Sequence, residues 1–382
     1  MRLAVGALSI LLLILTLYEV FEVMLLPRRV RRRLRFVRAY FDGTWKMWRA
    51  LGQRMTPGEG RETFLGVYGP LSLVLLLALW GATLTFEFAG FEWALSRARL
   101  HPPTFGTTLY MSGATLLTLG YGDVVPGTTA GRAAAVFEAG TGLGLIAVII
   151  GYLPVLYQLF ARREAQVVRL DARAGSPPTA TTLLVRHAVG ERMDALDGMF
   201  LEWELWSAEL LESHLSYPML AYYRSQHENE SWLAALTAVM DACALVMVGF
   251  RGVNTFQART TFGTARLTVL EMARVFDARH IAEQTERIRD LRLPTPEFNR
   301  MREGLAAAGL EFHGDDAARA GAEAELAEFR ALYEPFVATL AGHLLLPLPP
   351  WAPPPNALDN WQRSKGSAAL KRLVDSVEAE PE

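Results

Sequence analysis

Three long apolar runs interrupt a mixed polar background in the first 160 residues of the chain. They cover residues 3–26, with Glu19 and Glu22 as their charges, residues 64–86, with none, and residues 133–160, with Glu138. Each run exceeds the roughly 20 residues that a helix needs to cross a bilayer. The pattern therefore predicts three transmembrane helices. A cleaved signal peptide is the alternative for the first run, but its positive charge follows the apolar stretch, as PRRVRRRLR from Pro27.

The charged residues between these runs predict the orientation of the spans. Residues 28–62 contain eleven Lys and Arg against three Asp and Glu, whereas residues 87–132 contain three Lys and Arg. Lys and Arg are enriched on the cytoplasmic side of membrane helices. We therefore expect the N-terminus and residues 87–132 outside, and residues 28–62 and the chain from residue 161 onward inside.

The segment between the second and third runs is neither a full span nor an ordinary loop. Residues 101–132 read HPPTFGTTLYMSGATLLTLGYGDVVPGTTAGR, with an apolar stretch from Leu109 to Leu119. Irregular backbone at membrane depth survives only where protein buries it or where it lines a water-filled path. We expect a re-entrant structure, in which a short helix over residues 107–117 is followed by a loop.

The loop contains the sequence TLGYGD at residues 118–123. A dehydrated cation needs oxygen atoms that replace its hydration shell, and rings of backbone carbonyls can supply them. Consecutive carbonyls on one side require a backbone of alternating handedness, which Gly120 and Gly122 adopt without a Cβ penalty. The negative end of the preceding helix also favours a cation at this position. The alternative interpretation is a tight turn in a glycine-rich loop.

TLGYGD resembles the selectivity-filter signature of the potassium channel family, usually Thr-Val-Gly-Tyr-Gly-Asp, and the resemblance covers residues 64–160. It implies that the potassium-coordinating carbonyls belong to Thr118, Leu119, Gly120 and Tyr121, that Tyr121 is a spacer against the pore helix, and that Asp123 holds the outer end. One filter per chain implies a homotetramer, with potassium as the permeant ion and no cofactor. The chain departs from the family pattern at Gly113, Leu117 and Leu119.

The third run carries the candidate gating residues. Gly142 stands where this family often has a bending glycine, although close packing of a small residue is an equal alternative. Pro154 favours a kink near the inner mouth. Three apolar residues at helical spacing after Gly142 would line the cavity: Leu143, Ile146 and Ile150. Glu138 is an ionisable residue inside a span, so we expect a partner for it. It either braces the pore helix and filter or lies close to the outer interface.

The basic residues 28–62 are interleaved with aromatic residues, which suits the anionic cytoplasmic leaflet of a membrane. Nucleic-acid binding is the competing interpretation, and the position of the segment between two spans argues against it. None of the runs carries arginines at every third position, so we do not expect a voltage sensor.

Composition adds a division between two halves of the chain. The 382 residues are 51% hydrophobic and 20% charged, with one cysteine, which excludes a disordered or disulfide-stapled protein. Residues 1–160 hold 15 Lys and Arg against 9 Asp and Glu, whereas residues 161–382 hold 23 against 31. We therefore expect a membrane half and an acidic soluble half. The 35 arginines beside three lysines are typical of a GC-rich bacterial genome.

The soluble half is predicted to be helical. Its expected helices are residues 182–215, 231–250, 262–290, 296–309 and 316–344, followed by a proline-rich tail that wraps a surface. Residues 231–250 are apolar enough for a fourth span, but Asp241 at their centre favours a buried helix of a bundle, with Cys243 in the core. An acidic group at Glu191, Asp194, Asp197, Glu202, Glu204 and Glu209 is either a divalent-cation sensor or a solvated helix face.

The sequence thus predicts an all-α membrane protein: a potassium-channel pore unit, one extra N-terminal transmembrane helix and a C-terminal helical cytoplasmic domain. Its expected divisions are residues 1–27, 28–62, 63–163 and 164–382, namely first helix, interfacial linker, pore domain and cytoplasmic domain. The expected function is potassium conduction across a bacterial inner membrane. The alternative is a membrane receptor or scaffold with a vestigial pore. We do not expect an enzyme, because no Ser-His-Asp, P-loop or metal-site constellation is present in the sequence.

Overall fold

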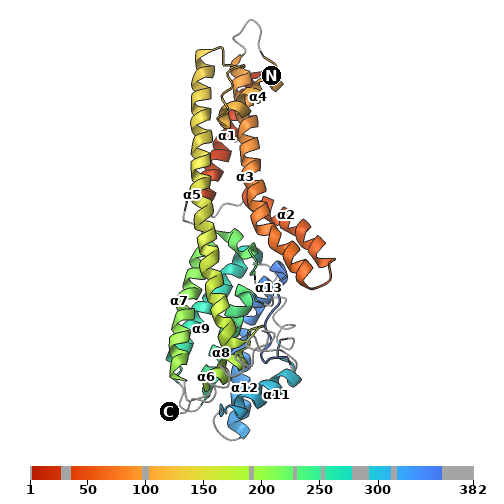
Figure 1. The fold of residues 1–382 in the computed structure, drawn as a ribbon, viewed down its shortest axis with the longest axis vertical. Coiled ribbons are helices and arrows are strands. Elements are labelled where there is room, and N and C mark those ends of the chain that lie inside the picture. Colours follow the sequence, from red (N-terminus) through yellow and green to blue (C-terminus); the bar gives the residue numbers. More distant parts are fainter. Residues whose placement is uncertain are drawn as a thin grey trace, which may run out of the picture. The chain divides into compact units, whose positions relative to one another are not determined.

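The computed structural model describes residues 2–26, 36–96, 103–188, 193–226, 230–250, 254–277, 292–310 and 316–354 (Figure 1). The chain divides into two compact units, Met1–Gln158 and Leu159–Glu382. All regular elements among the described residues are helices. The all-α class predicted from the sequence is therefore confirmed.

The first unit contains the three predicted spans. They are α1 (Arg2–Met24), α3 (Glu59–Leu95) and α5 (Thr129–Ala174), with α2 (Phe36–Gln53) and α4 (Phe105–Leu116) between them. The existence of all three spans is confirmed, although α3 and α5 are longer than their apolar runs. Helix α5 continues into the second unit because residues 161–174 keep a helical pattern after the apolar run ends.

Small residues let α1 and α3 approach closely. A Cβ added at Gly6 would lie 2.7 Å from the Cβ of Ala94. Such contacts are typical of membrane helices, which associate through packing because lipid gives them no hydrophobic drive. Further along, Leu13 of α1 packs with Leu84 and Phe88 of α3. This part of the first unit is therefore a close helix pair, and α4 packs against its α3 helix.

Helix α3 changes direction within its length. Pro70 lies inside this helix, where a proline removes a backbone hydrogen bond and bends the axis. Figure 1 shows the first turns of α3 leaving the line of its later turns, with α2 beside them. We call α2 and residues 59–72 of α3 the arm. Within its described residues, the predicted linker 28–62 therefore contains a helix, α2, that packs on α3.

The second unit is a helical bundle around α8 (Trp232–Gly249). Its other helices are α6 (Ala180–Ala188), α7 (Asp194–Ser216), η3 (Pro218–Tyr222), α9 (Phe256–Asp277), α11 (Thr295–Ala307), α12 (Asp316–Ala331) and α13 (Glu334–Leu344). Helix α8 is long and apolar enough to span a membrane, but 89% of it is buried inside the unit, against 17–39% for the three other candidates. Its Asp241 pairs with the buried Arg292. These observations support the prediction of a buried bundle helix.

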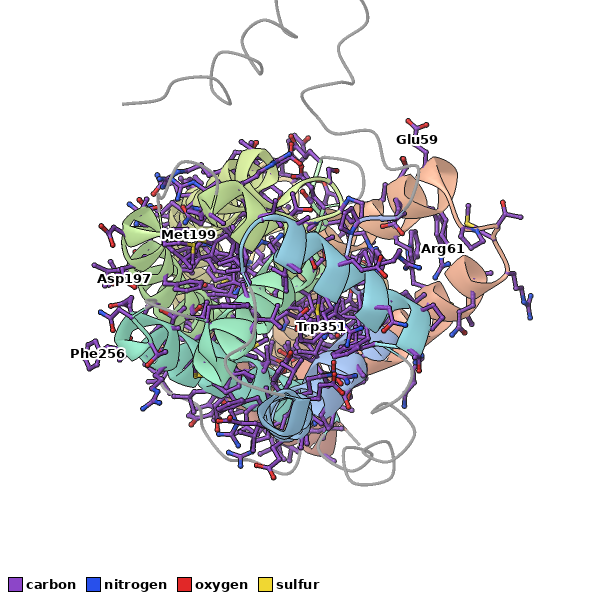
Figure 2. The ribbon with its side chains drawn as sticks, turned by 90° about the horizontal axis from the view of Figure 1, so that it is seen from below. Glu59, Arg61, Asp197, Met199, Phe256 and Trp351 are labelled. Carbon is purple, nitrogen blue, oxygen red and sulfur yellow. The ribbon has the colours of Figure 1, made fainter. Side chains whose placement is uncertain are left out.

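Two predictions for the soluble half are wrong. The single helix expected over residues 316–344 is two helices, because Pro335 cannot accommodate the carbonyl of Ala331, where α12 ends. The proline-rich tail does not lie wholly on a surface, since Trp351 is fully buried and its backbone N donates to Glu297 at 2.6 Å. Figure 2 shows Trp351 among the side chains inside the second unit.

The other helices expected in this half differ from the observed helices mainly in where they begin and end. The segment 182–215 holds α6 and α7, and its residues 189–192 lie outside the described residues. Helix α9 begins six residues before the expected helix 262–290, and residues 278–290 of that expected helix also lie outside the described residues. Helix α11 agrees with the expected range to within two residues at each end.

Candidate functional site

Helix α4 ends directly before the TLGYGD segment. The side chain of Thr104 caps its first turn by accepting a hydrogen bond from the backbone N of Thr107. At the other end, the N of Leu119 donates to the carbonyl of Ala114 at 2.8 Å, and the N of Thr118 donates to the carbonyl of Thr115 at 3.1 Å. This pair of bonds is the Schellman ending of a helix, which places Thr118 in the position that glycine normally takes.

The backbone of the TLGYGD segment alternates in handedness. Thr118, Gly120 and Gly122 have φ of 59°, 60° and 75°, and the residues between them do not share this sign. A β-branched residue with positive φ is an outlier that costs about 1–2 kcal/mol. Such strain persists where the surroundings impose it, and it is concentrated at functional sites. The alternation that the glycines predicted is therefore present, and it begins two residues before the first glycine, at Thr118.

Several side chains in this segment and directly before it are exposed to solvent in the single chain. Leu117, Leu119 and Tyr121 are 58%, 55% and 68% exposed. The expected packing of Tyr121 against a pore helix is thus not made within its own chain. Tyr110 of α4 lies close enough to Asp123 for a side-chain hydrogen bond, which links the pore helix to the end of the segment.

Gly142 of α5 contacts the end of α4. A Cβ at this position would lie 2.8 Å from the carbonyl carbon of Leu116 and 3.1 Å from its Cα, and closer still to the carbonyl oxygen. The neighbouring Gly140 and Gly144 have nothing within 4 Å of such a Cβ. Of the two interpretations left open for Gly142, the structure therefore supports close packing.

Glu138 connects three helices through one hydroxyl group. It is fully buried on α5, and its Oε1 contacts Ser112 Oγ of α4. The same Ser112 Oγ lies 2.8 Å from the carbonyl oxygen of Thr85 in α3. Ser112 is the donor in both contacts, so its hydroxyl proton is shared between the carbonyl oxygen of Thr85 and the carboxyl group of Glu138. This hydroxyl therefore joins α3, α4 and α5.

A second buried carboxyl group lies behind the segment, and the sequence analysis did not single it out. Glu92 near the end of α3 is 4% exposed, and neither of its oxygen atoms has a hydrogen-bond partner. It lines a cavity of about 40 Å³ together with Ser96, Thr108 and residues 124–128. The signal available in the sequence was a carboxylate beyond the apolar run of α3. The prediction of orientation counted only Lys and Arg in this segment and did not use Glu92.

The remaining predicted residues of α5 face away from their own chain. Leu143, Ile146 and Ile150 are 63%, 38% and 67% exposed, and Pro154 is also exposed. Apolar side chains in these positions need either lipid or another protein surface. The structure therefore places the predicted cavity-lining residues on one continuous open stretch of the helix.

At the start of the second unit, α5 is fixed to η3 through a buried arginine. Arg163 is 4% exposed and donates to the carbonyl oxygens of Leu220 at 2.8 Å and Tyr223 at 2.6 Å. His214 of α7 lies beside it, and burial together with the Arg163 charge lowers the pKa of His214 to about 3. The imidazole is therefore neutral at physiological pH, and the positive charge at this junction belongs to Arg163.

The acidic group of α7 does not form a metal centre among the described residues, where no set of three or more His, Cys, Asp or Glu side chains could hold an ion. Its members have separate partners instead: Glu202 pairs with Arg169 at 2.8 Å, and Glu204 accepts from Gln257 at 2.7 Å. Glu191 lies outside the described residues. The solvated-face interpretation is therefore the one that the geometry favours.

The candidate site thus consists of a short helix, α4, that ends at a loop of alternating handedness and lies beside long apolar helices. Residues 73–158 match the family model described as "Ion channel". The chain is also similar to the "Uncharacterized membrane protein YdjJ" of Bacillus subtilis (strain 168), with 25% identity over 211 residues. That alignment covers 53% of this chain and 60% of the relative, so the chain spans less than two thirds of the relative's length. No solved structure matches the chain. These findings support a multi-pass membrane protein whose residues 73–158 are similar to an ion channel family.

Proposed function

We propose that the protein is a potassium-selective channel that conducts as a homotetramer. The observation that carries this proposal is the positive φ at Thr118, Gly120 and Gly122 directly after the Schellman end of α4. In this role, the carbonyls of residues 118–121 form successive oxygen rings around the pore axis, and they replace the water of a dehydrated cation. The C-terminal end of α4 adds a negative dipole charge below them.

The tetramer follows from the open surfaces of the single chain. One chain supplies one TLGYGD segment, whereas a ring of carbonyls needs several copies around an axis. The exposed Leu119 and Tyr121 then pack against neighbouring chains, and Leu143 and Ile150 face the central cavity. Glu138 is a positioning residue in this account, since it fixes the pore helix through Ser112.

The inner end of α5 provides the gate. Pro154 interrupts the backbone bonds of this helix, and the apolar side chains before it can close a pore by excluding water. The Arg163 contacts couple the helix to the second unit, so movement of the cytoplasmic domain reaches the gate. The close packing of Gly142 leaves Pro154 as the preferred bending point. The topology is N-terminus outside and second unit in the cytoplasm of a bacterial cell.

Ion flux in liposomes tests this proposal. Purified full-length protein should carry potassium much faster than sodium, and Gly120→Asp should abolish the flux because a side chain at this positive φ strains the backbone that presents the carbonyls. Gly60→Asp is the matched control, since a side chain at Gly60 meets nothing within 4 Å and lies outside the pore. Equal and negligible flux from all three proteins would contradict the channel and favour the receptor or scaffold with a vestigial pore.

A further inference from the structure

The surface of helix α2 has three faces that carry different types of residue. At 3.6 residues per turn, Val37, Phe41, Thr44, Trp45 and Trp48 share one side. A second side carries Phe36, Ala39, Gly43, Met47, Ala50 and Leu51, and the third carries Arg38, Asp42, Lys46, Arg49 and Gln53. We call the second side the apolar stripe and the third the polar stripe. An ordinary surface helix would have one apolar side against its core and polar residues elsewhere.

The first side packs α2 firmly on α3. The rings of Trp48 and Phe64 stack with their centroids 4.5 Å apart and 3° between their planes. The hydroxyls of Thr44 and Tyr68 are 2.9 Å apart. Tyr40, which lies between Met47 and Leu51 around the helix, also reaches α3, where its hydroxyl donates to the carbonyl of Ser72 at 2.8 Å. These contacts fix the rotation of α2 about its axis, so the two other faces have defined directions.

Among the described residues of the first unit, none buries the large side chains of the apolar stripe. Phe36, Met47 and Leu51 are 50%, 61% and 45% exposed. Three large apolar side chains on one helix face, none of them buried, identify a surface that another apolar phase or protein covers. The stripe lies beside the basic polar stripe, where Arg38 and Lys46 are exposed. An apolar face next to basic residues is typical of helices that lie in a membrane interface.

The arm begins where the first span ends. The backbone N of Val37 donates to Oε1 of Glu19 at 2.8 Å, which holds the start of α2 against the last turns of α1. Val20, Leu76 and Trp80 pack together at the same level, with Val37 and Tyr40 against them. The bend at Pro70 then directs the arm away from the line of the spans. With residues 28–62 inside, this level is the cytoplasmic surface of the membrane.

We propose that the arm lies on the cytoplasmic leaflet, with the apolar stripe of α2 among the lipid chains and its basic residues on anionic headgroups. Charge complementarity supports this partner, because residues 28–62 carry eleven basic and three acidic side chains. The inference rests on the proposed topology, but it does not require conduction. It assigns a lipid-binding surface and the face that makes it.

Site-specific fluorescence quenching tests the proposal in the full chain. Met47→Cys and Leu51→Cys place a polarity-sensitive label on the apolar stripe, and Asp42→Cys and Gln53→Cys are matched controls on the polar stripe of the same helix. The native Cys243 is fully buried, and labelling of the unsubstituted protein measures any reaction there. The proteins are placed in phosphatidylcholine vesicles with or without phosphatidylglycerol, and brominated lipid chains act as the quencher.

Labels at Met47 and Leu51 should be quenched several-fold more than labels at Asp42 and Gln53. The difference should grow when phosphatidylglycerol is present and shrink at high salt. Equal quenching at the four positions would overturn the proposal. The proposal would also be overturned if neither brominated lipid nor aqueous iodide quenched the labels at Met47 and Leu51. Protein would then cover the apolar stripe.

A charge substitution separates this inference from the proposed function. Met47→Glu should lower the binding of the arm to phosphatidylglycerol vesicles, seen as lost quenching of a label at Leu51, whereas Asp42→Glu should leave it unchanged. If potassium flux fails in every protein while the quenching pattern holds, the channel proposal falls and the lipid surface stands. The reverse result, flux with no difference between the stripes, overturns the lipid surface alone.

Discussion

Replacing Gly142 by alanine separates packing from bending in α5. The new Cβ would lie 2.8 Å from the carbonyl carbon of Leu116. Carbon atoms in contact are ordinarily 3.5–4.0 Å apart, so the overlap is about 1 Å. The obstacle is backbone at the end of α4, which cannot rotate aside as a flexible side chain would. Overpacking of this kind typically costs about 1–3 kcal/mol.

A competing effect has the opposite sign. Alanine in a helix is favoured over glycine by about 1 kcal/mol. At Gly140 and Gly144, where a Cβ meets nothing within 4 Å of its own chain, the helix effect acts alone. The helix effect is the same in all three variants, so Gly142→Ala should be less stable than Gly140→Ala or Gly144→Ala by the overpacking cost, about 1–3 kcal/mol.

Thermal unfolding of the three purified variants in one detergent measures this difference. We expect a lower midpoint for Gly142→Ala than for wild type, and midpoints at or above wild type for the two controls. If Gly142→Ala were as stable as the controls, the contact with Leu116 would not be the reason for a glycine there. A bending role would then be the better explanation.

Three further substitutions probe the strained, bridging and buried groups. Thr118→Gly should raise the midpoint of thermal unfolding, because it removes about 1 kcal/mol of positive-φ strain, and it should lower potassium selectivity. A lower midpoint than wild type would show that Thr118 is not strained. Ser112→Ala should destabilise the full chain by about 1–3 kcal/mol, since a buried carboxyl group loses its partner, and unchanged stability would contradict the three-helix bridge. Asp241→Asn should cost about 3 kcal/mol in thermal unfolding, because its arginine stays buried, whereas Asp42→Asn at an exposed pair should cost under about 1 kcal/mol. Similar losses for these two variants would contradict the buried ion pair.

The three spans were predictable because membrane burial leaves a strong, local pattern in the sequence. The pore helix was also predictable, since its apolar stretch is too short to cross a bilayer, and α4 begins and ends within two residues of the expected range. In the same way, the central Asp241 of an otherwise apolar segment indicated a buried bundle helix rather than a fourth span.

Contacts between distant residues were not predictable from local pattern. The bridge from Glu138 through Ser112 to Thr85 joins residues 26 and 27 positions apart, and only the folded helices bring them together. The burial of Trp351 depends likewise on partners far away in the sequence. Thr118 was expected to contribute a backbone carbonyl, but its positive φ arises from the Schellman geometry of α4, which has no sequence signal when glycine is absent.

The central claim is that residues 118–123 select potassium. A recording from the full-length protein in a planar bilayer, with potassium chloride on one side and sodium chloride on the other, tests it most directly. The account predicts a reversal potential far from zero, with the sign that opposes the flow of potassium into the sodium chloride side, and no current from Gly120→Asp. A reversal potential near zero would show a pore that does not distinguish the two ions, and it would contradict the account.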